Sequence, residues 1–97
     1  KIEILIPMIS TLEELRRVKK TISEAAKACT ADSDNNPDIL IGTMIETPRA
    51  ALIADKIAAE CDFFSFGTND LTQMVFGLSR EAEASGVIEN YVENGIL

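Results

Sequence analysis

Three short apolar runs alternate along the chain with longer segments in which apolar residues recur every three or four positions. The runs are Ile2–Ile6, Ile39–Ile45 and Phe63–Phe66. Runs of this length that are rich in β-branched and aromatic residues predict buried strands, and strands that alternate with helical segments predict βαβ units. The pattern therefore predicts an α/β fold of three consecutive parallel βα units.

The first helical segment begins with two overlapping capping boxes. Ser10 lies three residues before Glu13, and Thr11 lies three residues before Glu14. In this arrangement the hydroxyl and the carboxylate accept hydrogen bonds from free amides at the start of a helix. We expect a helix over residues 11–28, with its apolar positions packed on the sheet. Its basic residues are expected to form a solvated face: Arg16, Arg17, Lys19 and Lys20.

Further helices are expected after the second and third strands. Thr47 is followed by proline, which is favoured at the first position of a helix, and the pattern predicts a helix over residues 48–59. Thr68 or Asn69 is expected to cap another helix after the third strand. Ser79 is expected to start one more.

Composition removes several classes of chemistry. The 97 residues include no histidine, so Ser-His or Cys-His catalysis, histidine metal ligands and a phosphohistidine are excluded within this sequence. The net charge of −7 argues against nucleic acid and anionic membranes as partners, and no apolar stretch is long enough to span a bilayer. Cys29 and Cys61 are expected to be reduced thiols in the cytosol rather than a disulfide.

Two carboxylates follow neighbouring predicted strands at the same level. Glu46 comes directly after the second strand, and Asp70 follows the third. The carboxyl ends of parallel strands gather at one edge of the sheet, where ligands bind in α/β proteins. Together with oxygens from Thr68 and Asn69, these carboxylates form a donor set that suits Mg²⁺ or Mn²⁺.

The turn from Gly67 into the next helix predicts an anion site beside these carboxylates. A glycine-led turn that enters a helix leaves amides unpaired, and the helix dipole favours a phosphate or carboxylate there. Asn69 could donate from its side-chain amide. The same residues also fit a purely structural alternative, in which Glu46 is only an acid near a helix start and Asn69 and Asp70 are ordinary capping residues.

Four other side chains are expected to have structural roles. Arg49 could pair with Glu46 or bind a carboxylate group, but a simple surface salt bridge is expected. Met8 and Met44 are expected in the core, and Cys61 is expected to be a buried, inert thiol.

The chain resembles the phosphoenolpyruvate-binding barrel shared by pyruvate phosphate dikinases, phosphoenolpyruvate synthases and enzyme I of the bacterial sugar phosphotransferase system. The residues that carry the resemblance cover about half the chain, and the dikinases are closest. The segments that carry the resemblance are IEILIPM, GTMIETPRAALIADKIA, FFSFGTNDLTQMVFGLSR and the final YVENGIL.

The resemblance implies that Glu46 and Asp70 bind Mg²⁺, and that Glu46, Gly67, Thr68, Asn69 and Asp70 bind substrate. The reaction implied is the interconversion of phosphoenolpyruvate and pyruvate through a phosphohistidine on a separate domain, with ATP, AMP, phosphate and diphosphate in the dikinases. The arginines that clamp the substrate and the cysteine that protonates the enolate, in a GICGEHGG-like motif, would lie outside residues 1–97. No catalytic residue of the family falls within the sequence.

We therefore interpret residues 1–97 as a fragment of the phosphoenolpyruvate/pyruvate-binding domain: part of a TIM (β/α)8 barrel, inactive alone. The resemblance implies as partners the phosphohistidine and nucleotide-binding domains of the full-length chain and a second copy in a homodimer. A cytoplasmic location is expected. The alternatives are a phosphoenolpyruvate synthase, an enzyme I type protein phosphotransferase, or a non-catalytic dimerisation module. An isolated three-stranded piece would have two bare edges and an uncovered apolar face, which favours self-association.

Overall fold

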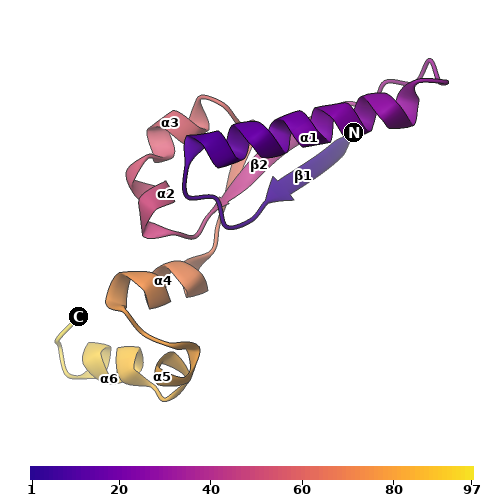
Figure 1. Ribbon diagram of the computed structural model, residues 1–97. Helices are drawn as coiled ribbons and strands as arrows, with labels where there is room; N and C mark the ends of the chain where they lie inside the picture. The colour runs from indigo at the N-terminus through magenta and orange to yellow at the C-terminus, as the bar shows by residue number, and fades with distance from the viewer.

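The computed structural model describes residues 1–97 and contains three strands and six helices (Figure 1). The first half of the chain forms β1 (Ile2–Ile6), α1 (Leu12–Thr30) and β2 (Ile39–Ile45). The remaining elements are α2 (Pro48–Leu52), α3 (Ala54–Ala58), β3 (Phe63–Phe66), α4 (Thr68–Phe76), α5 (Arg80–Ala84) and α6 (Val87–Glu93). All three predicted strands are confirmed with their predicted bounds.

The strands form one parallel sheet in the order β1-β2-β3. Ile6 at the end of β1 pairs with Thr43 of β2, and Ile45 at the end of β2 pairs with Phe66 of β3. The Thr43 hydroxyl is fully buried and donates a hydrogen bond to the Ile6 carbonyl at 3.0 Å. This register brings the carboxyl ends of the strands to one edge of the sheet, as predicted.

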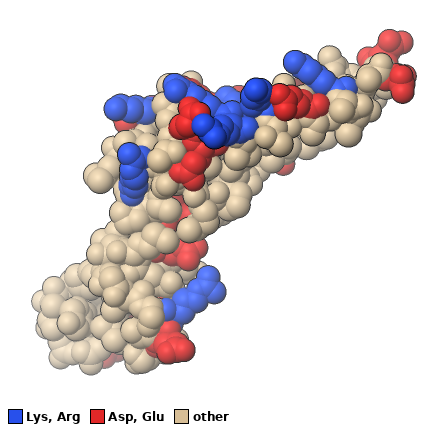
Figure 2. All heavy atoms as spheres, viewed as in Figure 1, with Lys and Arg blue, Asp and Glu red and all other residues tan.

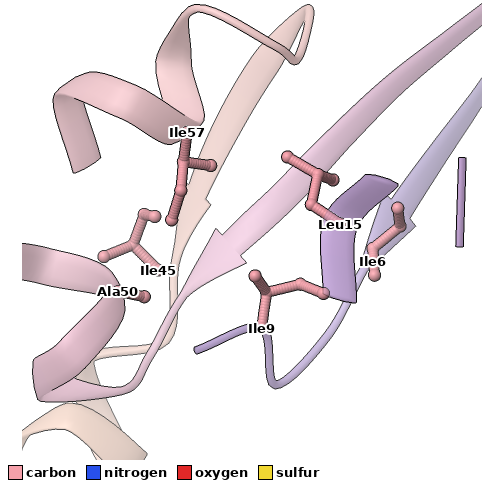
Figure 3. Packing of buried hydrophobic residues seen from close by; sticks show 6 residues of the cluster. All are labelled: Ile6, Ile9, Leu15, Ile45, Ala50 and Ile57. Atoms are coloured by element: carbon pink, nitrogen blue, oxygen red, sulfur yellow. The ribbon is translucent and has the colours of Figure 1, made fainter. Parts of the chain in front are cut away.

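The hydrophobic core lies between the sheet and the helices α1, α2 and α3 (Figure 3). Its six buried apolar residues come from the ends of β1 and β2 and from the helices above them: Ile6, Ile9, Leu15, Ile45, Ala50 and Ile57. Only 10 of the 97 residues are buried, and large apolar side chains such as Phe66 and Leu52 remain exposed. The core is therefore small, and the predicted uncovered apolar surface is confirmed.

The sheet is open, which confirms only part of the predicted fold class. Three parallel βα units are present, but they do not close into a barrel. Helices α4 to α6 extend away from the sheet, and the molecule measures 62 × 23 × 18 Å (Figure 1). No helix combines the length and the apolar character needed to cross a membrane.

The long helix α1 begins as its capping box predicts. The Thr11 hydroxyl accepts a hydrogen bond from the Glu14 amide at 3.1 Å and donates one to the Glu14 carboxylate at 2.9 Å. Hydrogen bonds from Ser10 and Thr11 lower the pKa of Glu14, because they stabilise its charged form. The helix continues to Thr30, two residues beyond the predicted end.

The helix predicted over residues 48–59 is interrupted at Ile53. This residue leaves the helical region with φ −114° and ψ 20°, and its amide bonds to the carbonyls of Ala50 and Ala51. Isoleucine is β-branched and has a lower helix propensity than the alanines around it. The prediction of one continuous helix was therefore wrong, although the Thr47 cap is confirmed by a 3.1 Å bond from the Ala50 amide.

Helix α4 is capped differently from the sequence prediction. Gly67 occupies the N-cap position, and neither Thr68 nor Asn69 makes a side-chain capping bond. The Gly67 carbonyl accepts the first helical bond, from Leu71 at 3.0 Å, so both Thr68 and Asn69 already lie inside the helix and cannot occupy the capping position. By contrast, Ser79 caps α5 through a 3.1 Å bond from the Ala82 amide, as predicted.

Met8 is not a core residue, contrary to expectation. It lies beyond the end of β1, is 49% exposed, and has a φ of 54°. Met44 is partly buried in β2. Cys29 and Cys61 are both free, as expected, but Cys61 is only partly buried; desolvation still raises the pKa of its thiol.

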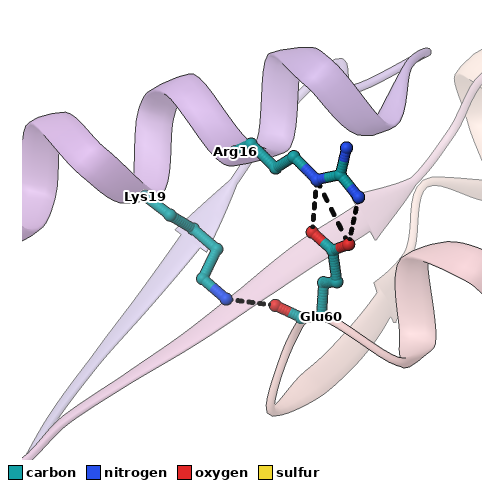
Figure 4. A network of polar contacts seen from close by, with 3 residues as sticks. All are labelled: Arg16, Lys19 and Glu60. Carbon is teal, nitrogen blue, oxygen red and sulfur yellow. Dashed lines mark hydrogen bonds and ion pairs between the residues drawn. The ribbon is translucent and has the colours of Figure 1, made fainter.

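The basic residues gather along α1, as Figure 2 shows, and Arg16 and Lys19 tie that helix to the turn before β3. The Arg16 guanidinium contacts both carboxylate oxygens of Glu60, with Nη2 to Oε1 at 2.6 Å and Nε to Oε2 at 3.0 Å (Figure 4). Lys19 donates to the Glu60 carbonyl. The side-chain hydrogen bond from Arg16 lowers the pKa of Glu60.

Replacing a core leucine should cost far more stability than replacing an exposed one. Leu15 is fully buried in α1, whereas Leu52 in α2 is 85% exposed. We expect Leu15→Ala to lower the free energy of unfolding by about 2–5 kcal/mol, and Leu52→Ala to change it by about 0.5 kcal/mol or less. Denaturant unfolding followed by circular dichroism measures both values, and similar losses in the two variants would contradict this core.

The Arg16 and Glu60 pair predicts a pH-dependent contribution to stability. The pKa of Glu60 is lowered in the folded chain, so the stabilisation is present above the ordinary glutamate pKa and is lost as pH falls through the lower folded value. We expect wild type to exceed Glu60→Gln in denaturation midpoint at pH 7, and we expect that advantage to shrink as acid protonates the Glu60 carboxylate. An exposed control, Glu81→Gln, should show no such change; a pH-independent difference for Glu60→Gln would refute the prediction.

Candidate active site

Glu46 lies at the carboxyl end of β2 and is almost fully buried. It is 4% exposed, and its Oε1 accepts a hydrogen bond from the Met8 amide at 2.6 Å. Met8 belongs to the segment that follows the neighbouring strand β1. The carboxylate is therefore held at the sheet edge between the ends of β1 and β2.

Gly67 lies against this carboxylate from the other side. Its amide donates to the Ile45 carbonyl at 3.0 Å, which continues the pairing of β2 with β3. A Cβ added at Gly67 would lie 2.5 Å from Glu46 Cβ and 2.6 Å from Glu46 Oε2. Only a glycine leaves room for Glu46 here, so the structure brings these two predicted site residues together.

The first turn of α4 presents unpaired amides at the same edge. The first amide that bonds back into this helix is that of Leu71, so the amides of Thr68, Asn69 and Asp70 have no backbone acceptor. Free amides and the helix dipole at such a terminus favour a bound anion. The geometry predicted for residues after Gly67 is present, although Gly67 itself is the cap.

Asp70 is placed differently from Glu46. Its Oδ1 lies 3.8 Å from Arg80 Nη2, and Arg80 is largely exposed. Asn69 and Asp70 line a polar surface pocket of about 510 Å³ together with residues of α4, α5 and α6: Gln73, Arg80, Glu83, Ala84 and Glu89. The two predicted carboxylates thus follow adjacent strands, but they have no hydrogen-bond or ion-pair partner in common.

The donor set fits a hard divalent cation with few protein ligands. Glu46 accepts one hydrogen bond, at Oε1, and its Oε2 faces the space that the missing Cβ of Gly67 leaves. No group of three or more histidine, cysteine, aspartate or glutamate side chains is arranged to hold a metal ion. Mg²⁺ commonly takes one or two carboxylates and completes its octahedron with water and substrate oxygens. Glu46 and Asp70 are of the right type for such a site.

Sequence reasoning missed the contacts that hold the site in place. Arg49 forms no salt bridge, contrary to expectation; its Nη1 donates to the Ser10 carbonyl at 2.7 Å, because that carbonyl lies beside the start of α2. The Thr47 hydroxyl donates to the Ile9 carbonyl at 3.1 Å in addition to capping α2. These contacts join segments about 38 residues apart, and no local sequence signal marks them.

Comparison with known proteins places the whole chain in one family. A family model described as "PEP-utilising enzyme, PEP-binding domain" matches residues 1–96. This match also covers the stretches outside the motifs that carry the resemblance.

Several curated relatives align with nearly all of the chain. It is 50% identical over 95 residues to pyruvate, phosphate dikinase of Rhizobium meliloti (strain 1021), covering 98% of this chain and 10% of that protein. It is 50% identical to pyruvate, phosphate dikinase 2 of Oryza sativa subsp. japonica, covering 98% of this chain and 11% of the relative. Pyruvate, phosphate dikinase of Clostridium symbiosum is 49% identical over 89 residues, which are 92% of this chain and 10% of that protein.

The chain spans about a tenth of the length of these relatives. The resemblance seen in the sequence is confirmed and extended by the family match over residues 1–96. This chain belongs to the family described as "PEP-utilising enzyme, PEP-binding domain".

Proposed function

We propose that this chain supplies the metal ligands and anion-binding amides for phosphoenolpyruvate and pyruvate in a phosphotransferase of the dikinase type. The observation that carries the proposal is the buried Glu46 carboxylate beside Gly67, where the unpaired amides of α4 begin. A carboxylate for a cation and free amides for an anion are what a small phosphorylated carboxylic acid requires.

In this proposal Glu46 and Asp70 bind Mg²⁺, for which Mn²⁺ could substitute. When bound, such an ion supplies charge stabilisation for an enolate and a phosphoryl group in transfer. Asp70 is partly exposed and its 3.8 Å contact with Arg80 is a surface pair, which contributes little free energy. The pair therefore does not prevent Asp70 from turning toward a ligand.

The substrate anion would bind the amides of Thr68, Asn69 and Asp70, with the Asn69 side chain as a further donor. Asn69 is exposed, and it lines the polar pocket next to these amides. Gly67 keeps the backbone close to Glu46, so anion and cation sites would lie side by side. Backbone donors fixed in place before the reaction stabilise developing charge without reorganisation.

Other parts of the reaction are assigned to residues outside the 97 of this chain. We propose that they include the phosphohistidine and nucleotide-binding domains and the remaining units of a TIM barrel built on this sheet. The chain on its own would bind ligands without turnover. The three parallel units and the uncovered apolar surface support such completion, because an open edge is where further strands would pair.

Substitution of Glu46 tests the proposal directly. Glu46→Gln keeps the size of the side chain but removes the charge that would bind a cation. In the complete gene product, we expect phosphoenolpyruvate turnover to fall by about 100-fold or more and Mn²⁺ affinity, measured by electron paramagnetic resonance, to fall with it. Glu81→Gln, an exposed glutamate in α5, is the control. Unchanged turnover and Mn²⁺ affinity in Glu46→Gln would rule out the metal role.

A non-catalytic dimerisation module is the second candidate, and one observation favours it. Apolar side chains are exposed in α4 and after α6, including Val75 at 60% and Ile96 at 62%. Patches of this kind mark surfaces that associate. For either function we propose that the protein forms a homodimer. Its cytoplasmic location stays a prediction.

Solution mass and metal binding separate the two candidates. Analytical ultracentrifugation of residues 1–97 should give a solution mass larger than the 10.6 kDa of the monomer. A dimer that also binds Mn²⁺ and phosphoenolpyruvate supports the enzymatic function, whereas a dimer that binds neither supports the interaction module. A stable monomer would contradict the proposed homodimer.

A further inference from the structure

We propose that the segment Pro7–Ser10 after β1 positions the Glu46 carboxylate, and that the left-handed backbone of Met8 aims the amide that does so. The inference rests on the proposed function, because the orientation of Glu46 matters only if this carboxylate binds a ligand. It adds a positioning residue that no sequence motif marks.

Met8 has a conformation that its own side chain does not explain. It is the only residue other than glycine with a positive φ, at 54°. L-residues with side chains disfavour this region, and such conformations persist where the surroundings fix them. The Met8 side chain is 49% exposed, so burial does not account for the conformation.

The conformation serves the contact with Glu46. It accompanies the 2.6 Å hydrogen bond from the Met8 amide to Glu46 Oε1. This is the one hydrogen bond that the protein makes to the Glu46 side chain. Because the carboxylate is 4% exposed, losing its only donor would leave an acceptor without a protein partner in a nearly dry site.

Three further hydrogen bonds from β2 and the start of α2 fix this segment and the last residue of β1 before it. The hydroxyl groups of Thr43 and Thr47 donate to the carbonyls of Ile6 and Ile9 at 3.0 and 3.1 Å. The Arg49 side chain donates to the Ser10 carbonyl at 2.7 Å. The side chain of Ile9 is also buried in the core, at 3% exposure. Together these contacts, which we call the seam, hold the carbonyls of Ile6, Ile9 and Ser10 on the two sides of Met8.

The seam accounts for how Met8 keeps its unfavourable backbone conformation, and that conformation orients the Met8 amide. These bonds hold the chain on both sides of the Pro7–Met8 peptide, and in this arrangement the Met8 amide points at Glu46. Its bond occupies Oε1, while Oε2 faces Gly67 and the start of α4. Partners that orient a metal-binding side chain commonly change metal affinity by about 10–100-fold when they are removed. Met8 is thus a positioning residue that acts through its backbone.

A pair of substitutions at position 8 separates backbone conformation from side-chain identity. Met8→Gly keeps the amide and adopts positive φ without steric cost, whereas Met8→Val keeps the amide but strongly disfavours positive φ. We expect Mn²⁺ affinity, measured by electron paramagnetic resonance on the complete gene product, to be lower in Met8→Val than in Met8→Gly by about 10–100-fold. Met74→Val is the matched control, since Met74 is similarly exposed, at 43%, but lies in helix α4.

A second variant removes the donor alone. Incorporating the α-hydroxy analogue of methionine at position 8 replaces the amide N–H with an ester oxygen and keeps the side chain. It tests the same hydrogen bond if Met8→Val does not fold, and we expect a similar loss of Mn²⁺ affinity. Thermal unfolding of each variant reports whether the fold is retained.

The outcomes distinguish this inference from the proposed function. If Glu46→Gln loses Mn²⁺ binding and both the valine and the ester variants bind like wild type, Met8 does not position Glu46 and the inference is wrong. If Glu46→Gln itself binds Mn²⁺ like wild type, the proposed function fails. Weak binding in the valine and ester variants, with stronger binding in Met8→Gly, supports the inference.

Discussion

The parallel pairing of β2 between β1 and β3 determines where every candidate site residue lies. Because Ile45 pairs with Phe66, β2 and β3 end at the same level, and β1 ends two residues earlier, where Ile6 pairs with Thr43. The residues that follow the three strands therefore meet at one edge. A shift of one residue would turn each side chain to the opposite face of the sheet. Thr43 fixes this register from inside, since its buried hydroxyl donates to the Ile6 carbonyl.

At that edge of the sheet, a charged side chain is buried although the hydrophobic core is small. Glu46 is nearly buried in a chain that buries only 10 residues. A carboxylate removed from water is costly unless it keeps strong partners. The structure gives Glu46 one backbone donor at 2.6 Å and leaves its second oxygen beside a glycine. In the proposed function, a bound cation would compensate the remaining charge.

Local rules predicted the elements well and failed where tertiary contacts decide the conformation. The apolar runs predicted all three strands. The caps at Thr11, Thr47 and Ser79 are those expected from short-range hydrogen bonding. The cap at Gly67 accompanies the close approach of Glu46, a contact between residues far apart in the sequence that no local rule indicates. Arg49 illustrates the same limit: its carbonyl partner at Ser10 is 39 residues away, so a nearby carboxylate was a reasonable but wrong expectation.

The candidate site could be predicted as a list of residues but not as an arrangement. Strand order alone places Glu46 and Asp70 after neighbouring strands, and glycine at position 67 indicates a tight turn into a helix. The contact with Met8 could not be found in this way, since methionine carries no signal for a left-handed backbone. Such a conformation follows from four hydrogen bonds between segments far apart in the sequence. The positions of the groups at this edge of the sheet therefore depend on hydrogen bonds that form only in the folded chain. Substitutions of the residues that make these bonds should change ligand binding even where their side chains do not contact a ligand.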